Sequence, residues 1–255
     1  MTLLFLLACG DDCGVDDDCK VADGVYRAQV PSGAAPAAGW PVAFHFYGYQ
    51  GTPEKSMGDT QALADMDGAG VLFVVPDHED GWDFDGSGGL GSRDDRAFLD
   101  QVLDDLDTRW GIDRSQLLLT GHSVGGSAVH DLACGDPGSW TAAAPFAGVF
   151  WEPFPTSCTT PAIPLRHTHG LADTTWPWEG RSFGEHATQG DVGEALAFWV
   201  AERGCGADST TETVSVSTCE TWSGCTGDLQ LCTHEGGHAL PDDWAATSAA
   251  WLLGL

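Results

Sequence analysis

The residues whose order most clearly suggests chemistry form a Gly-His-Ser-Val-Gly motif at 121–125. An apolar run at 117–120 precedes the motif and predicts a buried strand, and an alanine-bearing segment at 127–134 follows and predicts a helix. The serine would therefore lie at the apex of a sharp strand–turn–helix connection, where glycines on both sides permit close packing. This context predicts that Ser123 is a nucleophile with its hydroxyl raised above a sheet.

A serine hydroxyl needs a base to take its proton, and the base needs a third group to hold its tautomer. Asp173 follows a strand predicted at 162–168, and His238 follows one predicted at 229–233. The order serine, acid, histidine is that of the α/β-hydrolase fold. The alternatives are a turn cap for Asp173 and a solvated loop position for His238. Weaker candidates are His122, His186 and His234 for the base, and Asp191 and Asp228 for the acid.

An oxyanion formed by attack on a carbonyl needs two backbone N–H donors. We assign these to Val124, directly after the serine, and to Tyr49, in a glycine-bearing loop after a strand predicted at 41–47. The Tyr49 ring would then line an acyl pocket. The alternative is an ordinary loop without this role. Three tryptophans in loops near the expected site could stack on flat substrates, or could simply pack on the domain: Trp82, Trp176 and Trp178.

The rest of the chain is expected to build one domain that positions these loops. Further strands are predicted at 25–30 (an edge strand), 71–75, 142–148 and 214–217, and helices at 93–110, 192–202 and 242–253. Strands that alternate with helices indicate a mostly parallel, doubly wound sheet. We therefore expect a single α/β-hydrolase domain over 24–255, without a large lid.

Several motifs together resemble the family of secreted esterases that contains polyhydroxybutyrate depolymerases and feruloyl esterases. From about Pro41 onward, in order, the pieces are Tyr-Gly-Tyr-Gln-Gly-Thr, Val-Val-Pro-Asp with Gly-Trp after it, Arg-Asp-Asp-Arg-Ala-Phe-Leu, Gly-Ile-Asp-Arg-Ser-Gln, the serine motif, Leu-Ala-Cys, His-Gly-x-x-Asp and Gly-Gly-His-x-x-Pro. The resemblance implies a catalytic triad of Ser123, Asp173 and His238, with no cofactor. It implies a carboxylic ester substrate of polymeric or aromatic type. The chain departs from the family at Tyr47, where histidine is usual, and at Gln50, where glycine is usual.

Charge and the amino terminus bear on location. The formal net charge is -28, from 10 basic and 38 acidic residues, which excludes nucleic acid and anionic membrane surfaces as partners. The apolar segment 1–9 resembles a bacterial lipoprotein signal with lipid attached to Cys9; the alternatives are a plain export signal and a chance apolar start. An acidic tether is expected at 10–23. We expect an exported monomer, attached to a membrane only through lipid on Cys9.

Cysteine usage supports export. Nine cysteines are present, and without Cys9 an even set remains, which predicts four disulfides in an oxidising compartment. The expected pairs are Cys13–Cys19 and Cys134–Cys158, with Cys205, Cys219, Cys225 and Cys232 pairing among themselves. The alternative is that some of these cysteines are buried free thiols.

Three other hypotheses about binding or activity compete with the esterase hypothesis. His234, Glu235 and His238 match a zinc-protease pattern, but that pattern needs a helix and this segment contains two glycines. A possible calcium loop, Asp83, Asp85, Ser87 and Asp94, lacks a preceding helix and is better interpreted as a solvated loop. The third is a non-catalytic surface binding protein that keeps a hydrolase fold.

Overall fold

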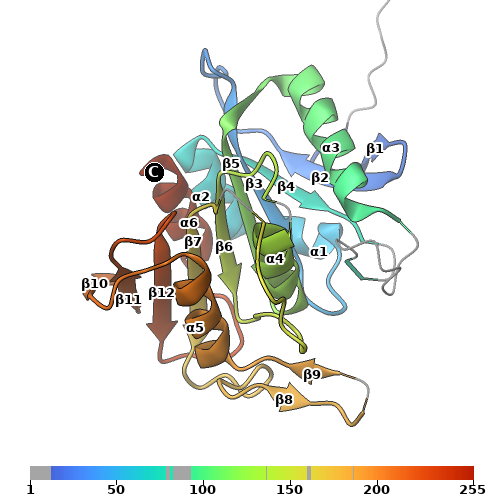
Figure 1. The fold of residues 1–255 in the computed structure, drawn as a ribbon. Helices are drawn as coiled ribbons and strands as arrows, with labels where there is room; N and C mark the ends of the chain where they lie inside the picture. Colours follow the sequence, from blue (N-terminus) through green and yellow to red (C-terminus); the bar gives the residue numbers. More distant parts are fainter. Residues whose placement is uncertain (1–12, 79–80, 83–92, 136, 160–161, 186) are drawn as a thin grey trace, which may run out of the picture.

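The computed structural model describes residues 13–78, 81–82, 93–135, 137–159, 162–185 and 187–255. A ten-stranded sheet crosses the molecule in the order β1-β2-β4-β3-β5-β6-β7-β12-β11-β10 (Figure 1). Its central strands are parallel: β4 (Leu72–Pro76), β3 (Trp40–Phe46), β5 (Ile112–His122), β6 (Ala142–Phe146), β7 (Leu165–Gly170) and β12 (Leu229–His234). The expected mostly parallel, doubly wound sheet is confirmed.

Helices cover both faces of the sheet, which explains why the central strands are continuous apolar runs. Alternate side chains of β3 point to opposite faces: Val42 and Phe44 join one core cluster, and Ala43 joins the other. The first cluster packs under α3 (Asp95–Trp110), α4 (Val124–Gly135) and α5 (Val192–Glu202). The second packs under α1 (Pro53–Met57), α2 (Thr60–Ala69) and α6 (Trp244–Leu253). The sequence patterns did not predict α1 or α2.

The amino-terminal part of the described chain corrects two expectations. Strand β1 (Cys19–Val21) pairs antiparallel with β2 (Gly24–Gln29), so β2 is not the edge strand. The acidic tether expected at 10–23 is wrong from residue 13 onward, because Cys19 is fully buried and is bonded to Cys13. The disulfide and the burial of Cys19 stabilise this short acidic segment as a hairpin on the sheet. The segment 1–9 and Cys9 lie outside the described residues.

The other end of the sheet is a hairpin of β10 (Ser209–Val214) and β11 (Ser217–Trp222). The strand predicted at 214–217 is wrong, because Val216 lies in the turn of this hairpin and is 65% exposed. The residues that the structure describes contain four disulfides, in which both expected pairs are confirmed and the remaining four cysteines pair among themselves. They are Cys13–Cys19, Cys134–Cys158, Cys205–Cys225 and Cys219–Cys232.

A small hairpin of β8 (Arg181–Ser182) and β9 (Thr188–Gln189) follows the loop after β7 and lies below the sheet in Figure 1. Within the described ranges, no second domain covers the sheet. None of the helices in this part of the chain is long and apolar enough to cross a bilayer.

Candidate active site

Ser123 occupies the single-residue turn between β5 and α4 with a φ of 59°. A residue with a side chain adopts this left-handed conformation at a cost of about 1–3 kcal/mol, so the surroundings must hold it there. The Ser123 N–H donates to Phe146 O at 2.9 Å, and the Ser127 N–H donates to Ser123 O at 3.0 Å. The predicted strand, sharp turn and helix are therefore present, with the serine at their junction.

The two glycines of the motif have a steric reason. A Cβ placed on Gly121 would lie 2.2 Å from Gly125 O, and a Cβ on Gly125 would lie 2.0 Å from Phe46 O. Both distances are far shorter than a van der Waals contact. The first turn of α4 can therefore lie against the ends of β5 and β3 only if both positions lack a side chain.

Asp173 lies in the turn after β7, with a carboxylate that is fully buried. Its Oδ1 accepts the N–H groups of Thr175 and Trp176, both at 2.8 Å. Its Oδ2 lies 2.7 Å from His238 Nδ1. The turn-capping role considered for Asp173 thus occupies one oxygen, and the other oxygen faces the histidine. Three donors compensate the burial of the charge.

His238 follows β12 in a non-helical loop. A hydrogen bond from its Nδ1–H to Asp173 leaves its Nε2 as an acceptor. His122 stabilises this loop, because its Nε2–H donates to His238 O at 2.5 Å. The centroids of the two imidazole rings are 4.7 Å apart. Burial lowers the pKa of His122, so that it donates as a neutral ring. His122 immediately precedes Ser123, so this contact places His238 beside the serine.

The structure brings Asp173 and His238 into direct contact and Ser123 into their neighbourhood. In the part of the chain that the structure describes, the Ser123 hydroxyl has no hydrogen-bond partner. Serine and base are often farther apart without substrate than during reaction. Of the weaker candidates, His122 contacts the site, Asp191 caps α5 and His186 lies outside the described residues.

The loop after β3 passes directly over the serine. A Cβ on Gly48 would lie 3.1 Å from Ser123 Cβ. Val124 is the first residue of α4, where backbone N–H groups lack partners within the helix. The two donors assigned to the oxyanion thus belong to segments that flank Ser123. The Tyr49 side chain is 81% exposed, and a role for its ring in lining the acyl pocket stays a prediction.

Both departures from the esterase family lie in this loop. Tyr47 is buried, its hydroxyl donates to Asp77 Oδ1 at 2.6 Å, and it accepts the His78 N–H at 3.1 Å. Burial and the bond to Asp77 raise the pKa of Tyr47, so the hydroxyl stays protonated and ties the loop to the end of β4. Gln50 has a φ of 60°, the left-handed conformation for which glycine is best suited.

The three tryptophans proposed to bind substrate are placed differently. Trp176 is fully buried, and its Nε1–H donates to Gly190 O at 3.1 Å. The prediction that Trp176 contacts substrate is therefore wrong, since it forms the core beneath the Asp173 loop. Trp82 and Trp178 are half-buried; Trp82 packs edge-on against Phe46 with centroids 4.6 Å apart. A substrate role for these two stays a prediction.

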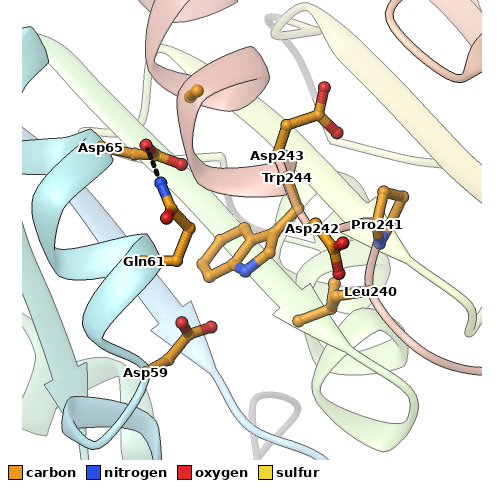
Figure 2. A pocket seen from close by; sticks show the side chains of 9 residues that line it. Asp59, Gln61, Asp65, Leu240, Pro241, Asp242, Asp243 and Trp244 are labelled. Atoms are coloured by element: carbon orange, nitrogen blue, oxygen red, sulfur yellow. Dashed lines mark hydrogen bonds between the residues drawn. The ribbon is translucent and has the colours of Figure 1, made fainter.

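Two neighbouring hollows lie beside the site. The smaller, about 210 Å³, reaches Gly48 and His122, which both adjoin Ser123. It shares Asp59, Leu240 and Trp244 with a hollow of about 540 Å³ between α2 and the start of α6. Figure 2 shows this larger hollow, in which carboxylates surround the Trp244 indole: Asp59, Asp65, Asp242 and Asp243. The flank of the site is therefore strongly acidic.

The two metal-binding alternatives concern the segment from His234 to His238 and the segment before α3. His234 ends a strand, and the residues from Glu235 to His238 form a bend rather than a helix. The zinc-protease pattern requires a helix to bring its histidines to one ion, so that alternative is contradicted. Asp94 caps α3 by accepting the Arg96 and Ala97 N–H groups. The other members of the calcium candidate, Asp83, Asp85 and Ser87, lie outside the described residues.

Comparison with known proteins identifies the fold. No family model matches the chain, and no curated protein matches it. Among solved structures, the chain is similar to an acetyl xylan esterase from Aspergillus awamori, with a TM-score of 0.64, 15% identity, and coverage of 90% of this chain and 98% of that one. An S-formylglutathione hydrolase from Agrobacterium tumefaciens gives 0.56, 14%, 93% and 96%, and esterase PE8 gives 0.54, 18%, 91% and 98%. The chain thus has the α/β-hydrolase fold that these esterases share.

Proposed function

We propose that this protein is an exported serine esterase that hydrolyses carboxylic esters through an acyl-enzyme. One observation carries the proposal: Ser123 sits in a left-handed turn beside an Asp173–His238 pair joined at 2.7 Å. The three residues follow β5, β7 and β12, whose carboxyl ends lie on the same edge of the parallel sheet. A fold alone does not establish an activity, whereas a nucleophile, a base and an orienting acid in one place support a specific chemistry.

In the proposed mechanism, Ser123 Oγ attacks the ester carbonyl carbon while His238 Nε2 takes the hydroxyl proton. Asp173 holds the imidazole through Nδ1–H and stabilises the imidazolium that forms. The N–H groups of Val124 and Tyr49 bind the oxygen as it gains negative charge. The imidazolium then gives its proton to the leaving alkoxide, and the alcohol departs. Water, deprotonated by His238, attacks the acyl-enzyme and releases the acid, which restores the serine.

The site surroundings support a neutral ester as substrate. The carboxylates beside the site, including Asp59 and Asp242, would repel an anionic substrate. Aromatic side chains occur around the same edge: Tyr49 is 81% and Phe183 is 43% exposed, and Trp82 and Trp178 are half-buried. Such rings suit stacking on a feruloyl group, a sugar or a flat polyester unit. We therefore propose a polymeric or aromatic ester.

Export is supported by four disulfides, because such bonds persist in oxidising compartments. We further propose that lipid on Cys9 attaches the protein to a membrane and that the protein is a monomer. The net charge of -28 supports the absence of nucleic acid among its partners.

The test is a panel of p-nitrophenyl acetate, methyl ferulate and polyhydroxybutyrate, each offered to the wild type and to Ser123→Ala. We expect at least one ester to be hydrolysed, and the variant to lose about 10⁶-fold in kcat. No turnover of any ester by the wild type would favour the non-catalytic binding protein. Turnover that persists in Ser123→Ala would reject Ser123 as the nucleophile.

A further inference from the structure

Three histidines outside the proposed triad form a hydrogen-bonded row through the core. The indole Nε1–H of Trp199, on α5, donates to His130 Nδ1 at 2.9 Å. His130 Nε2 lies 3.2 Å from His167 Nδ1, and His167 Nε2 lies 3.2 Å from His169 Nδ1. The row ends where His169 Nε2 lies 3.0 Å from the carbonyl oxygen of Trp176. All three imidazoles are buried, and the row connects α5 and α4 to the acid loop through direct contacts.

The two ends of the row determine where its protons are. The indole of Trp199 can only donate, so His130 Nδ1 must accept and the proton of this ring is on Nε2. The Nε2–H of His130 then donates to His167 Nδ1, and the Nε2–H of His167 donates to His169 Nδ1. The carbonyl of Trp176 can only accept, and it receives the last Nε2–H. Each ring is therefore neutral with its proton on Nε2, and all six ring nitrogens have partners.

Charged groups around the row agree with neutral rings. The Arg203 guanidinium lies over the Trp199 ring, 4.8 Å from its centroid. Burial, with Arg203 and His169 nearby, lowers the pKa of His130 to about 3, and burial likewise lowers the pKa of His167. Asp173, His238 and His234 all lie near His169. The Asp173 charge would raise the pKa of His169, but burial has the larger effect and lowers it. The row begins at an indole N–H and ends at a backbone carbonyl oxygen, neither of which exchanges a proton readily, so the row has no proton to carry to the site.

The last histidine bonds the residue whose N–H also bonds the proposed catalytic acid. His169 Nε2 holds the Trp176 carbonyl at 3.0 Å and lies 3.7 Å from Asp173 Oδ2. The N–H of the same residue, Trp176, donates to Asp173 Oδ1 at 2.8 Å. A shift of Trp176 would therefore rotate the carboxylate whose other oxygen faces His238.

We propose that His169, fixed in its tautomer by His167 and His130, is a positioning residue that aligns Asp173 with His238. Its consequence for catalysis rests on the proposed esterase function, but the alignment itself does not. The competing explanation is that the imidazoles only fill the core. Core filling requires volume but no particular donor, whereas alignment requires a donor to the Trp176 carbonyl.

The experiment compares His169→Phe, which removes the donor, with His169→Gln, whose amide N–H can still reach the Trp176 carbonyl. We expect His169→Phe to lose about 100-fold in kcat with little change in KM, because a small misplacement of the acid disturbs the reacting geometry. His169→Gln should restore most of the loss. The matched control is Tyr26→Phe, which removes another buried donor, since the Tyr26 hydroxyl bonds Asp105 Oδ2 at 2.6 Å outside the row and outside both hollows. It should leave kcat nearly unchanged. Equal losses in all three variants, or none in His169→Phe, would overturn the proposal.

NMR supplies a readout that does not need enzymatic activity, and its first part uses only the wild type. In the wild type with ¹⁵N-labelled histidine at about pH 6, we expect His130, His167 and His169 to be neutral with the proton on Nε2. A charged ring or an Nδ1–H tautomer at any of the three would refute the row. The downfield Nδ1–H signal of His238, which reports its bond to Asp173, should persist in His169→Gln and be lost in His169→Phe. If these signals behave as expected while the wild type hydrolyses no ester, the esterase proposal fails and the alignment stands.

Discussion

At the scale of single residues, the site depends on backbone positions that most side chains cannot occupy. Ser123 has a φ of 59°, and Gly148 also packs against it, since a Cβ there would lie 2.0 Å from Ser123 O. The serine is thus held on several sides by backbone rather than by side chains that could rotate. Such preorganisation places the hydroxyl before any substrate arrives.

Gly125→Ala tests this dependence. The new Cβ would lie 2.0 Å from Phe46 O, so the start of α4 must shift and carry Ser123 and the Val124 N–H with it. We expect kcat/KM to fall by about 100-fold and stability to fall by about 1–3 kcal/mol, measured by ester hydrolysis and urea unfolding.

Gly68→Ala is the control, because Gly68 lies in α2 and a Cβ there meets nothing within 4 Å. That change should keep full activity and stabilise the protein by about 0.5–1 kcal/mol. Unchanged activity in Gly125→Ala would show that the packing of the turn is not needed.

Residues with a local signal could be predicted, and residues that act through tertiary contacts could not. Ser123 has its motif, and Asp173 and His238 follow strands in a recognisable order. The burial of Trp176 could not be predicted from its neighbours in the sequence, because it depends on packing and on the bond from its indole nitrogen to Gly190, 14 positions away. The histidine row was missed for the same reason: His130 and Trp199 are 69 positions apart in the chain.

At the scale of elements, prediction followed apolar burial. The strands with continuous apolar runs were found, whereas β10 was missed because most of its residues are polar and exposed. Helix α2 buries only Ala62 and Met66 and contains Gly68, so its apolar periodicity is weak. The hairpins at both edges are held by disulfides, a constraint that the apolar pattern of the strands does not show.

The Cys134–Cys158 disulfide ties the end of α4 to the segment before β7, and closes 24 positions of sequence. Its loss in the double variant Cys134→Ser/Cys158→Ser should cost about 3 kcal/mol, because the unfolded chain regains loop entropy. Urea unfolding measures this cost, and kcat should be unchanged because the bond lies away from the triad.

Removal of Cys13–Cys19 is the internal comparison, since it closes only 6 positions and should cost about 2 kcal/mol. A larger cost for the shorter loop would show that loop entropy does not govern these bonds.

At the scale of the whole molecule, buried neutral histidines make stability depend on pH. Burial lowers the pKa of His45 and of His130 to about 3, from an ordinary value of 6.5. Above pH 6.5 neither state binds the proton and no stability is lost. As the pH falls from 6.5 toward 3, only the unfolded chain takes it up, so the folded state loses about 1.4 kcal/mol per pH unit for each histidine.

We therefore expect the free energy of unfolding to fall by about 4 kcal/mol between pH 7 and pH 5 for these two groups together. Urea titrations across this range measure the fall, and His45→Phe should show a slope smaller by about 1.4 kcal/mol per pH unit. The acidic surface acts in the opposite sense, because a net charge of -28 is relieved by protonation. Stability that rises throughout this range would mean that surface repulsion outweighs the histidines.

The most direct test of the central claim is covalent labelling with a p-nitrophenyl alkylphosphonate, which reacts with an activated serine as an ester carbonyl would. The wild type should take up one phosphonyl group per chain, located on Ser123 by peptide mass spectrometry. Labelling should be absent in Ser123→Ala and slower by about 10³-fold or more in His238→Ala. A label on another residue, or a rate that does not depend on His238, would contradict the account.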